Sequence, residues 1–125
     1  DIINLESTIE GMAANQNNPE QYTRQDLAFH LALASATHNQ LFPLLLSPIA
    51  NLLSEAMLLS CHGPGAVEAG LRYHRIILGA LQAHDAAGAR AAMDDHIRVA
   101  QEMVGALRQE LESSLNARCE DDCPR

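Results

Sequence analysis

The chain has 125 residues, enough for one domain with a single hydrophobic core and too few for two. Its 16 acidic residues outnumber 8 basic ones, all of them arginine, and the formal net charge is −8. Phosphates are repelled by such a surface, so we expect this chain by itself not to bind DNA, RNA or an anionic membrane. Hydrophobic residues make up 47% of the chain but aromatic residues only 3%. An aliphatic core of this kind favours packed helices over sheets.

Sorting signals and cysteine pattern both favour a cytoplasmic protein. The first residues lack the basic start and apolar middle of a signal peptide. No run of about 20 uninterrupted apolar residues predicts a membrane span. The three cysteines, Cys61, Cys119 and Cys123, define no disulfide framework, which is typical of a reducing compartment. We therefore expect no membrane association.

The first two helices are set off by turn-forming residues. Apolar residues at helical spacing predict a helix over 2–15, which ends at the asparagine-rich run before Pro19 because proline cannot continue a helix. A second helix is predicted over 20–37, with Thr23 as a candidate N-cap. It ends at the polar pair that follows.

The third helix is predicted over 41–60 and contains two prolines near its start. We expect one of Pro43 and Pro48 to lie in the first turn and the other to mark a kink or a late start. A loop rich in glycine and proline then ends this segment. The fourth helix is predicted over 66–84, where apolar residues recur every three or four positions.

The last helix is predicted to be the longest. It follows Asp85, which stands where a short link or an N-cap would be, and its apolar row continues to Leu111. We expect residues 1–117 to form one domain and residues 118–125 to be a flexible acidic tail. Five amphipathic helices with short connections predict an all-α antiparallel bundle.

Polar residues interrupt three of the apolar rows. Asp26 and His30 are four residues apart and therefore share one helix face. His74 and His96 each occupy a position in an otherwise apolar row. Any one of them could be a core histidine with a hydrogen-bonding partner. Four such groups in one core would be costly without a shared partner, and a divalent metal is the simplest one.

The donor set is one carboxylate and three imidazoles, which suits zinc best, with nickel, manganese, cobalt or iron as alternatives. A ligand site in the bundle core is one interpretation of this set. Another is a small metalloenzyme, a hydrolase or hydratase, although no separate general base lies on the same rows. A third is a histidine phosphotransfer bundle, which would need a solvent-facing histidine.

Further polar residues could contact a molecule held beside the metal. These are Tyr22, Thr23 and Asn51, although each is equally suited to a cap or a solvated position. The remaining three histidines border turns or loops and are not expected to be ligands.

The ordered set of motifs resembles the FCD domain, the effector-binding C-terminal domain of the FadR subfamily of GntR-type bacterial transcription regulators. The resemblance covers about residues 2–115. It is carried by Asp26-Leu-Ala-Phe-His30, His74-Arg75-x-Ile77 and Ala89-x-x-Ala92-Met93-x-x-His96.

This resemblance implies a function and a ligand set. It implies that Asp26, His30, His74 and His96 bind a divalent metal at which a small organic acid docks. It also implies a homodimer that senses a metabolite and is not an enzyme. DNA would be bound only through an N-terminal winged helix-turn-helix, which we do not find in this chain, and we also do not find the family's opening helix.

Overall fold

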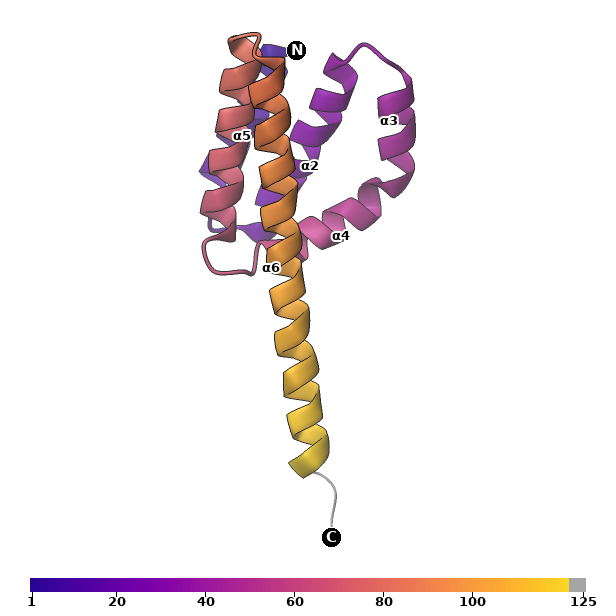
Figure 1. Ribbon diagram of the computed structural model, residues 1–125, viewed down its shortest axis with the longest axis vertical. Helices are drawn as coiled ribbons and strands as arrows, with labels where there is room; N and C mark the ends of the chain where they lie inside the picture. Colours follow the sequence, from indigo (N-terminus) through magenta and orange to yellow (C-terminus); the bar gives the residue numbers. More distant parts are fainter. Residues whose placement is uncertain (122–125) are drawn as a thin grey trace.

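The computed structural model describes residues 1–121, and the regular structure of this part is helical throughout (Figure 1). The predicted all-α bundle of five helical segments is confirmed, and the third segment is divided into three pieces. In chain order the elements are α1 (Ile2–Ala14), α2 (Pro19–Ala36), α3 (Leu41–Leu46), the 3₁₀ turn η1 (Ser47–Ile49), α4 (Ala50–Ser60), α5 (Ala66–Gln82) and α6 (Ala86–Asp121).

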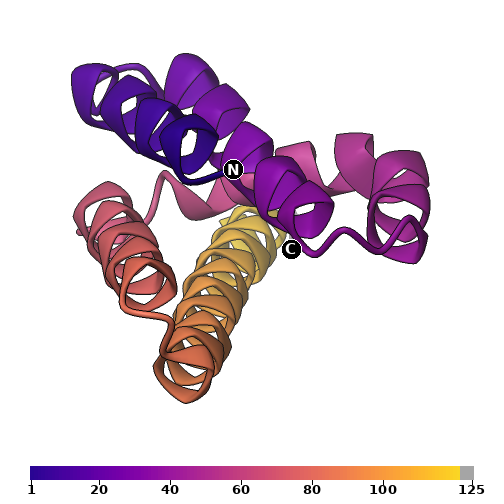
Figure 2. The ribbon, with the colours of Figure 1, turned by 90° about the horizontal axis from the view of Figure 1, so that it is seen from above.

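Two helix pairs make up the bundle. Figure 2 shows α1 beside α2 and α5 beside α6, and α1 also packs against α5. The core lies among these four helices, whereas α3, η1 and α4 contribute no fully buried residue. Its members come from all four helices: Leu5, Ile9, Met12, Tyr22, Phe29, Leu71, Ile77 and Ala92.

Side-chain caps define where two helices begin. The backbone N–H of Gln21 donates to Asn18 Oδ1 over 3.2 Å, so Asn18 is the N-cap of α2. The suggestion that Thr23 is this N-cap is therefore wrong, because the helix already starts at Pro19. At α6 the predicted cap is confirmed: the N–H of Gly88 donates to Asp85 Oδ1 over 2.9 Å.

The third segment bends away from the bundle. Pro43 lies in the first turn of α3 and Pro48 in η1, as expected from the two prolines. By length and mean hydropathy, which reaches 1.5, Leu41–Ser60 meets the criteria for a membrane span, contrary to the sequence expectation. One such segment is weak evidence of membrane crossing, and Pro48 divides this one.

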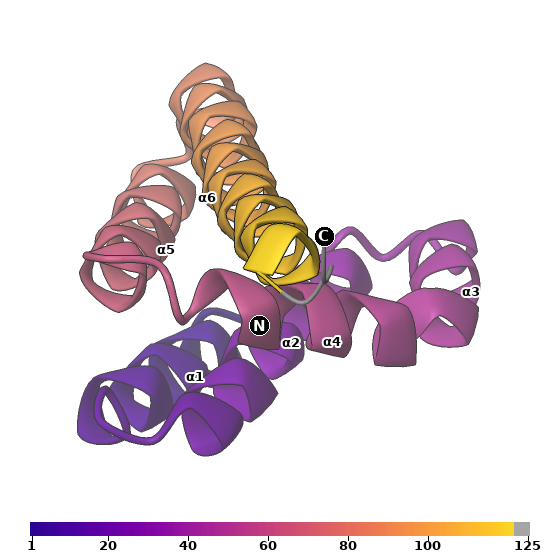
Figure 3. The same ribbon diagram turned by 90° about the horizontal axis from the view of Figure 1, so that it is seen from below.

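The last helix runs well past the bundle, as Figure 1 and the view from below in Figure 3 show. Its apolar row is partly buried as far as Leu107, whereas Leu111 is exposed, so the row leaves the core there. Residues 122–125 lie outside the described part of the chain. The predicted boundary at residue 117 and the tail of residues 118–125 stay predictions.

Candidate metal centre

Three helices bring four potential metal ligands together. Asp26 and His30 lie on α2, His74 lies on α5 and His96 lies on α6. Each offers one ligand atom, and these atoms all lie within 4.8 Å of one another. The four residues that the sequence singled out therefore share one site.

The ligand atoms converge on one small volume. Asp26 Oδ1 lies 3.0 Å from His74 Nε2 and 3.3 Å from His30 Nε2. His30 Nε2 is in turn 3.4 Å from the Nε2 atoms of both His74 and His96, which is too long for a strong hydrogen bond. One carboxylate oxygen and three imidazole nitrogens thus face one another.

Packing between rings fixes the orientation of the imidazoles. The Phe29 ring meets the His74 ring edge-on, with centroids 4.5 Å apart. The rings of His30 and His96 are stacked, 5.4 Å apart and 13° from parallel. His74 is completely buried and Asp26 nearly so, while His30 and His96 are partly exposed. One side of the cluster is therefore enclosed and the other approaches solvent.

Two buried polar atoms lack an aligned hydrogen bond among the described residues. They are Asp26 Oδ1, despite its two close imidazole neighbours, and His74 Nδ1. Buried polar atoms without a partner destabilise a fold by about 1–3 kcal/mol each. A carboxylate oxygen and three imidazole nitrogens form a donor set that suits zinc and similar divalent cations. The residues present therefore fit such a cation.

Electrostatics shift the pKa values of two clustered residues, Asp26 and His96. Burial by itself would raise the pKa of the Asp26 carboxyl, but the imidazoles of His30 and His74 outweigh burial, and the pKa lies well below its usual range. Burial, followed by the neighbouring His74 and His30, lowers the pKa of His96 to about 4. At neutral pH Asp26 is therefore ionised and His96 is neutral.

The residues suggested as contacts for a second ligand lie in different environments. Tyr22 is buried and its hydroxyl donates to the Val67 carbonyl over 3.1 Å. Thr23 is buried with its Oγ1 3.6 Å from Cys61 Sγ. Both lie about one turn before Asp26 on α2. Asn51 is exposed in the first turn of α4, and the structure does not bring it to the cluster.

Aromatic neighbours of the cluster were missed by the sequence reasoning. Phe29 was overlooked although it directly precedes His30 in the chain. Tyr73 was overlooked too, and its ring lies 6.0 Å from that of His96, with the Arg72 guanidinium 4.9 Å from the tyrosine ring on α5. The available signal was adjacency to the histidines, in a chain with very few aromatic residues.

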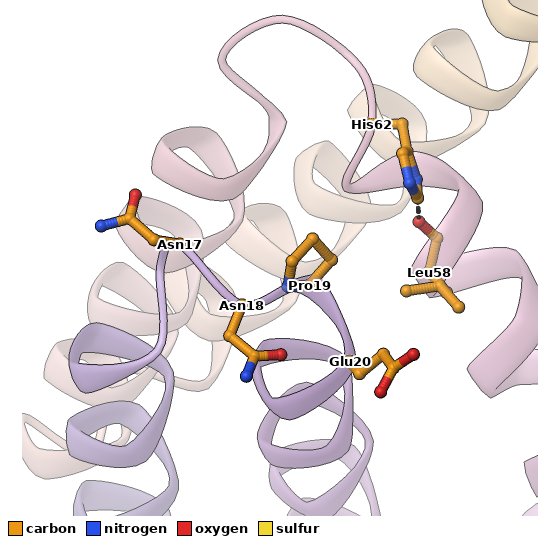
Figure 4. A pocket seen from close by; sticks show the side chains of 6 residues that line it. All are labelled: Asn17, Asn18, Pro19, Glu20, Leu58 and His62. Atoms are coloured by element: carbon orange, nitrogen blue, oxygen red, sulfur yellow. Dashed lines mark hydrogen bonds between the residues drawn. The ribbon is translucent and has the colours of Figure 1, made fainter.

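The surface pocket in Figure 4 is separate from the cluster. It measures about 380 Å³ and lies where the turn before α2 approaches the end of α4. In it the ring of His62 donates from Nδ1 to the Leu58 carbonyl over 2.8 Å. None of the four clustered residues lines this pocket, so its position does not bear on the metal site.

The fold and the cluster together define an all-α domain with a cation-binding constellation in its core. The family model of the FCD domain matches residues 1–99, and the chain therefore belongs to the FCD domain family. FCD domains are the ligand-sensing domains of GntR-type transcription regulators, which are not enzymes. No curated protein matches the sequence. The resemblance found in the motifs is thus confirmed at the level of the family.

Proposed function

We propose that this chain is the metal-dependent effector-sensing domain of a FadR-subfamily regulator and that it responds to a small carboxylic acid. The observation that supports this proposal best is the convergence of Asp26 Oδ1 with three imidazole Nε2 atoms from α2, α5 and α6. A single divalent cation would satisfy all four of these atoms together, including the buried Asp26 Oδ1.

Zinc is the metal that we propose, with nickel, manganese, cobalt or iron as alternatives. When bound, the cation supplies a coordination position for an effector carboxylate. The cluster residues hold their lone pairs in place, and Phe29 keeps solvent from the His74 side. The effector would approach from the side of His30 and His96, which is partly exposed.

The chain offers hydroxyl groups rather than arginines for further effector contacts. Arg24, Arg72 and Arg98, each two residues from a clustered residue, are exposed. We propose Tyr22 and Thr23, about one turn before Asp26 on α2, as the contacts beside the metal.

We propose that effector binding tightens the packing of the three helices that supply ligands. An effector acts only through different affinities for two states of the protein. In a cytoplasmic homodimer, such a shift would be passed to DNA-binding domains elsewhere in the full-length regulator.

Metal content is the direct test. Protein purified without chelator or histidine tag should contain about one equivalent of divalent metal, measured by elemental mass spectrometry. EDTA should lower the melting temperature, because a metal held by three helices stabilises the fold. Carboxylic acids such as lactate, malate and citrate should raise it only in the metal-loaded protein.

Removing one ligand should have the same effect as chelation. His74→Ala should lower metal affinity at least tenfold, as measured by competition with a chromogenic chelator. The matched control is His62→Ala, since that exposed ring lies outside the cluster and should leave affinity unchanged. Equal metal content in both variants would contradict the proposed ligand set, and turnover of model esters by the loaded protein would favour an enzyme instead.

A further inference from the structure

Two apolar surfaces of this chain have no partner among the described residues. The first, here called the apolar face, consists of exposed side chains of α3, η1 and α4. The second, called the arm, is the part of α6 at residues 108–116, which is exposed throughout and lies beyond the partly buried Leu107. Residues of the apolar face are Leu41, Phe42, Leu44, Leu45, Ile49, Leu52 and Leu59.

The apolar face is extensive and almost uncharged. Leu44 and Leu45 are 67% and 70% exposed. Between residues 41 and 60 the only charged residue is Glu55. Contiguous apolar surfaces of this kind on a folded domain mark sites where another molecule binds.

The arm carries its own exposed apolar row. Leu111 and Leu115 are each 60% exposed and continue the row that is partly buried at Leu107. Its polar residues include the pair Arg108 and Glu112, whose side chains meet at 2.8 Å. A helical stretch of this length is marginal in water on its own, so the arm is expected to pack against a partner.

The arm cannot cover the apolar face of its own chain. α6 is one uninterrupted helix of 36 residues, and its C-terminal half extends away from α3 (Figure 1). Within residues 1–121, the arm therefore leaves the apolar face uncovered.

We propose that the arm of one copy packs on the apolar face of a second copy, and that the second arm packs reciprocally on the first. This arrangement covers both unpartnered surfaces at once and closes as a two-fold dimer. It rests on the dimer proposed above and adds the surfaces that form it.

Packing the arm on the apolar face is favoured over two simpler dimers, in which arm would pack on arm or face on face. Pairing arm with arm would bring the Glu110 carboxylates of two copies together, whereas the apolar face presents one carboxylate along its whole length. Pairing face with face would leave both arms uncovered. The lengths are also compatible, because the roughly 14 Å of helix from residue 108 to 116 fits along the 11 residues of α4.

The pairing would also connect the partner to the metal centre. His96 and the arm belong to the same helix, so a movement of α6 at the cluster would be passed to the second copy.

Mass measurement by analytical ultracentrifugation tests the surfaces. The 125-residue chain should sediment as a dimer. Leu44→Ser/Leu45→Ser and Leu111→Ser/Leu115→Ser should each raise the dimer dissociation constant at least tenfold while metal content stays unchanged, which shows that the bundle is folded. Ile3→Ser is the matched control, because Ile3 is 80% exposed on α1, outside both surfaces, and should leave the dimer intact.

Cross-linking tests the pairing itself. In chains whose native cysteines are replaced by serine, Leu45→Cys protein mixed with Leu111→Cys protein should form disulfide-linked heterodimers on oxidation. Predominant cross-linking of Leu111→Cys protein with itself would overturn the pairing. If both double-serine variants remain dimeric, the assignment of the two surfaces to the interface is wrong, although the chain still dimerises. If the unaltered chain is monomeric at all concentrations, both the assignment and the proposed dimer are wrong. Binding of a monomer to phosphatidylcholine vesicles, lost in Leu44→Ser/Leu45→Ser, would assign the apolar face to a membrane.

Discussion

His74 is the most enclosed of the clustered side chains, and its surroundings explain how one imidazole connects three helices. It projects from α5, meets Phe29 of α2 edge-on and lies 4.5 Å, between ring centroids, from His96 of α6. Its Nδ1 finds no acceptor among the described residues. Ligating histidines ordinarily donate their second N–H to an acceptor that holds the ring. Here the aromatic packing holds the ring instead.

Close packing beside Tyr22 makes one glycine sensitive to substitution. A Cβ at Gly70 would lie 2.7 Å from the Tyr22 hydroxyl, whose ring is buried and cannot move aside cheaply. Gly70→Ala gains about 1 kcal/mol of helix propensity. It also breaks the hydrogen bond to Val67 and strains the core, which together cost about 2–4 kcal/mol. We therefore expect a net loss of about 1–3 kcal/mol in the free energy of unfolding, measured in urea.

The same helix supplies the control for this substitution. At Gly79 an added Cβ meets nothing within 4 Å. Gly79→Ala should therefore stabilise the domain by about 0.5–1 kcal/mol. Equal effects of the two substitutions would show that Tyr22 is not held rigidly.

The lowered pKa of His96 makes the metal-free domain sensitive to acid. Its folded pKa of about 4 lies below the ordinary value of 6.5, since burial, His74 and His30 all disfavour the charged ring, while Asp26 opposes them. Between these two values the unfolded chain binds a proton that the folded chain does not, so stability falls as pH falls. In EDTA, the His96 contribution to this fall should be on the order of 1 kcal/mol between pH 7 and pH 5. Urea unfolding at several pH values measures it.

Substituting His96 distinguishes its contribution to the pH dependence of stability from those of the other titrating groups. His96→Gln should show a shallower loss of stability over that pH range, whereas His84→Gln, at an exposed position, should follow the unaltered chain. Parallel curves for His96→Gln and the unaltered chain would contradict the assignment. Below pH 4 both proteins should lose further stability as Asp26, whose pKa is also lowered, takes up a proton.

At the scale of helices, the elements could be predicted but their exposure could not. Every predicted helical segment exists, and Pro48 divides the third one as expected. The N-cap of α2 was misplaced because Thr23 and Asn18 are both good cap residues, and Pro19 at the first helical position was the better signal. α3 is strongly apolar, yet it contains no buried residue. Periodicity shows which face is apolar but not whether a neighbouring element covers it.

The N-cap formed by Asp85 should contribute measurably to the free energy of unfolding. Asp85→Ala removes the acceptor for the Gly88 N–H at the start of α6 and should destabilise the domain by about 1 kcal/mol in urea unfolding. Asp85→Asn keeps a side-chain acceptor and should have little effect. Metal affinity should be unchanged in both variants, since His96 lies about three turns further along α6.

At the scale of the whole molecule, the four clustered residues could be predicted because each breaks an apolar row. That anomaly is visible in the chain, and the helical fold then brings Asp26, His74 and His96 together. The shape of the surroundings could not be predicted in this way. Contacts such as Phe29 on His74 and Tyr73 near His96 depend on how helices are rotated against one another, and the number of apolar residues on a helix does not specify that rotation.

Metal binding should divide the molecule into a protected and an unprotected part. The proposed ligands lie on α2, α5 and the first part of α6, whereas α3 and η1 contain no buried residue and supply no proposed ligand. Opening any ligand-bearing helix would have to release the metal, so its opening free energy should rise with metal binding, while that of α3 should not. Hydrogen exchange followed by mass spectrometry with and without zinc measures both. We expect at least tenfold slower exchange in α2, α5 and residues 86–100, and unchanged exchange in α3. Uniform slowing across all helices would instead indicate that zinc acts on the global unfolding equilibrium alone, and no slowing in α5 would remove His74 from the ligand set.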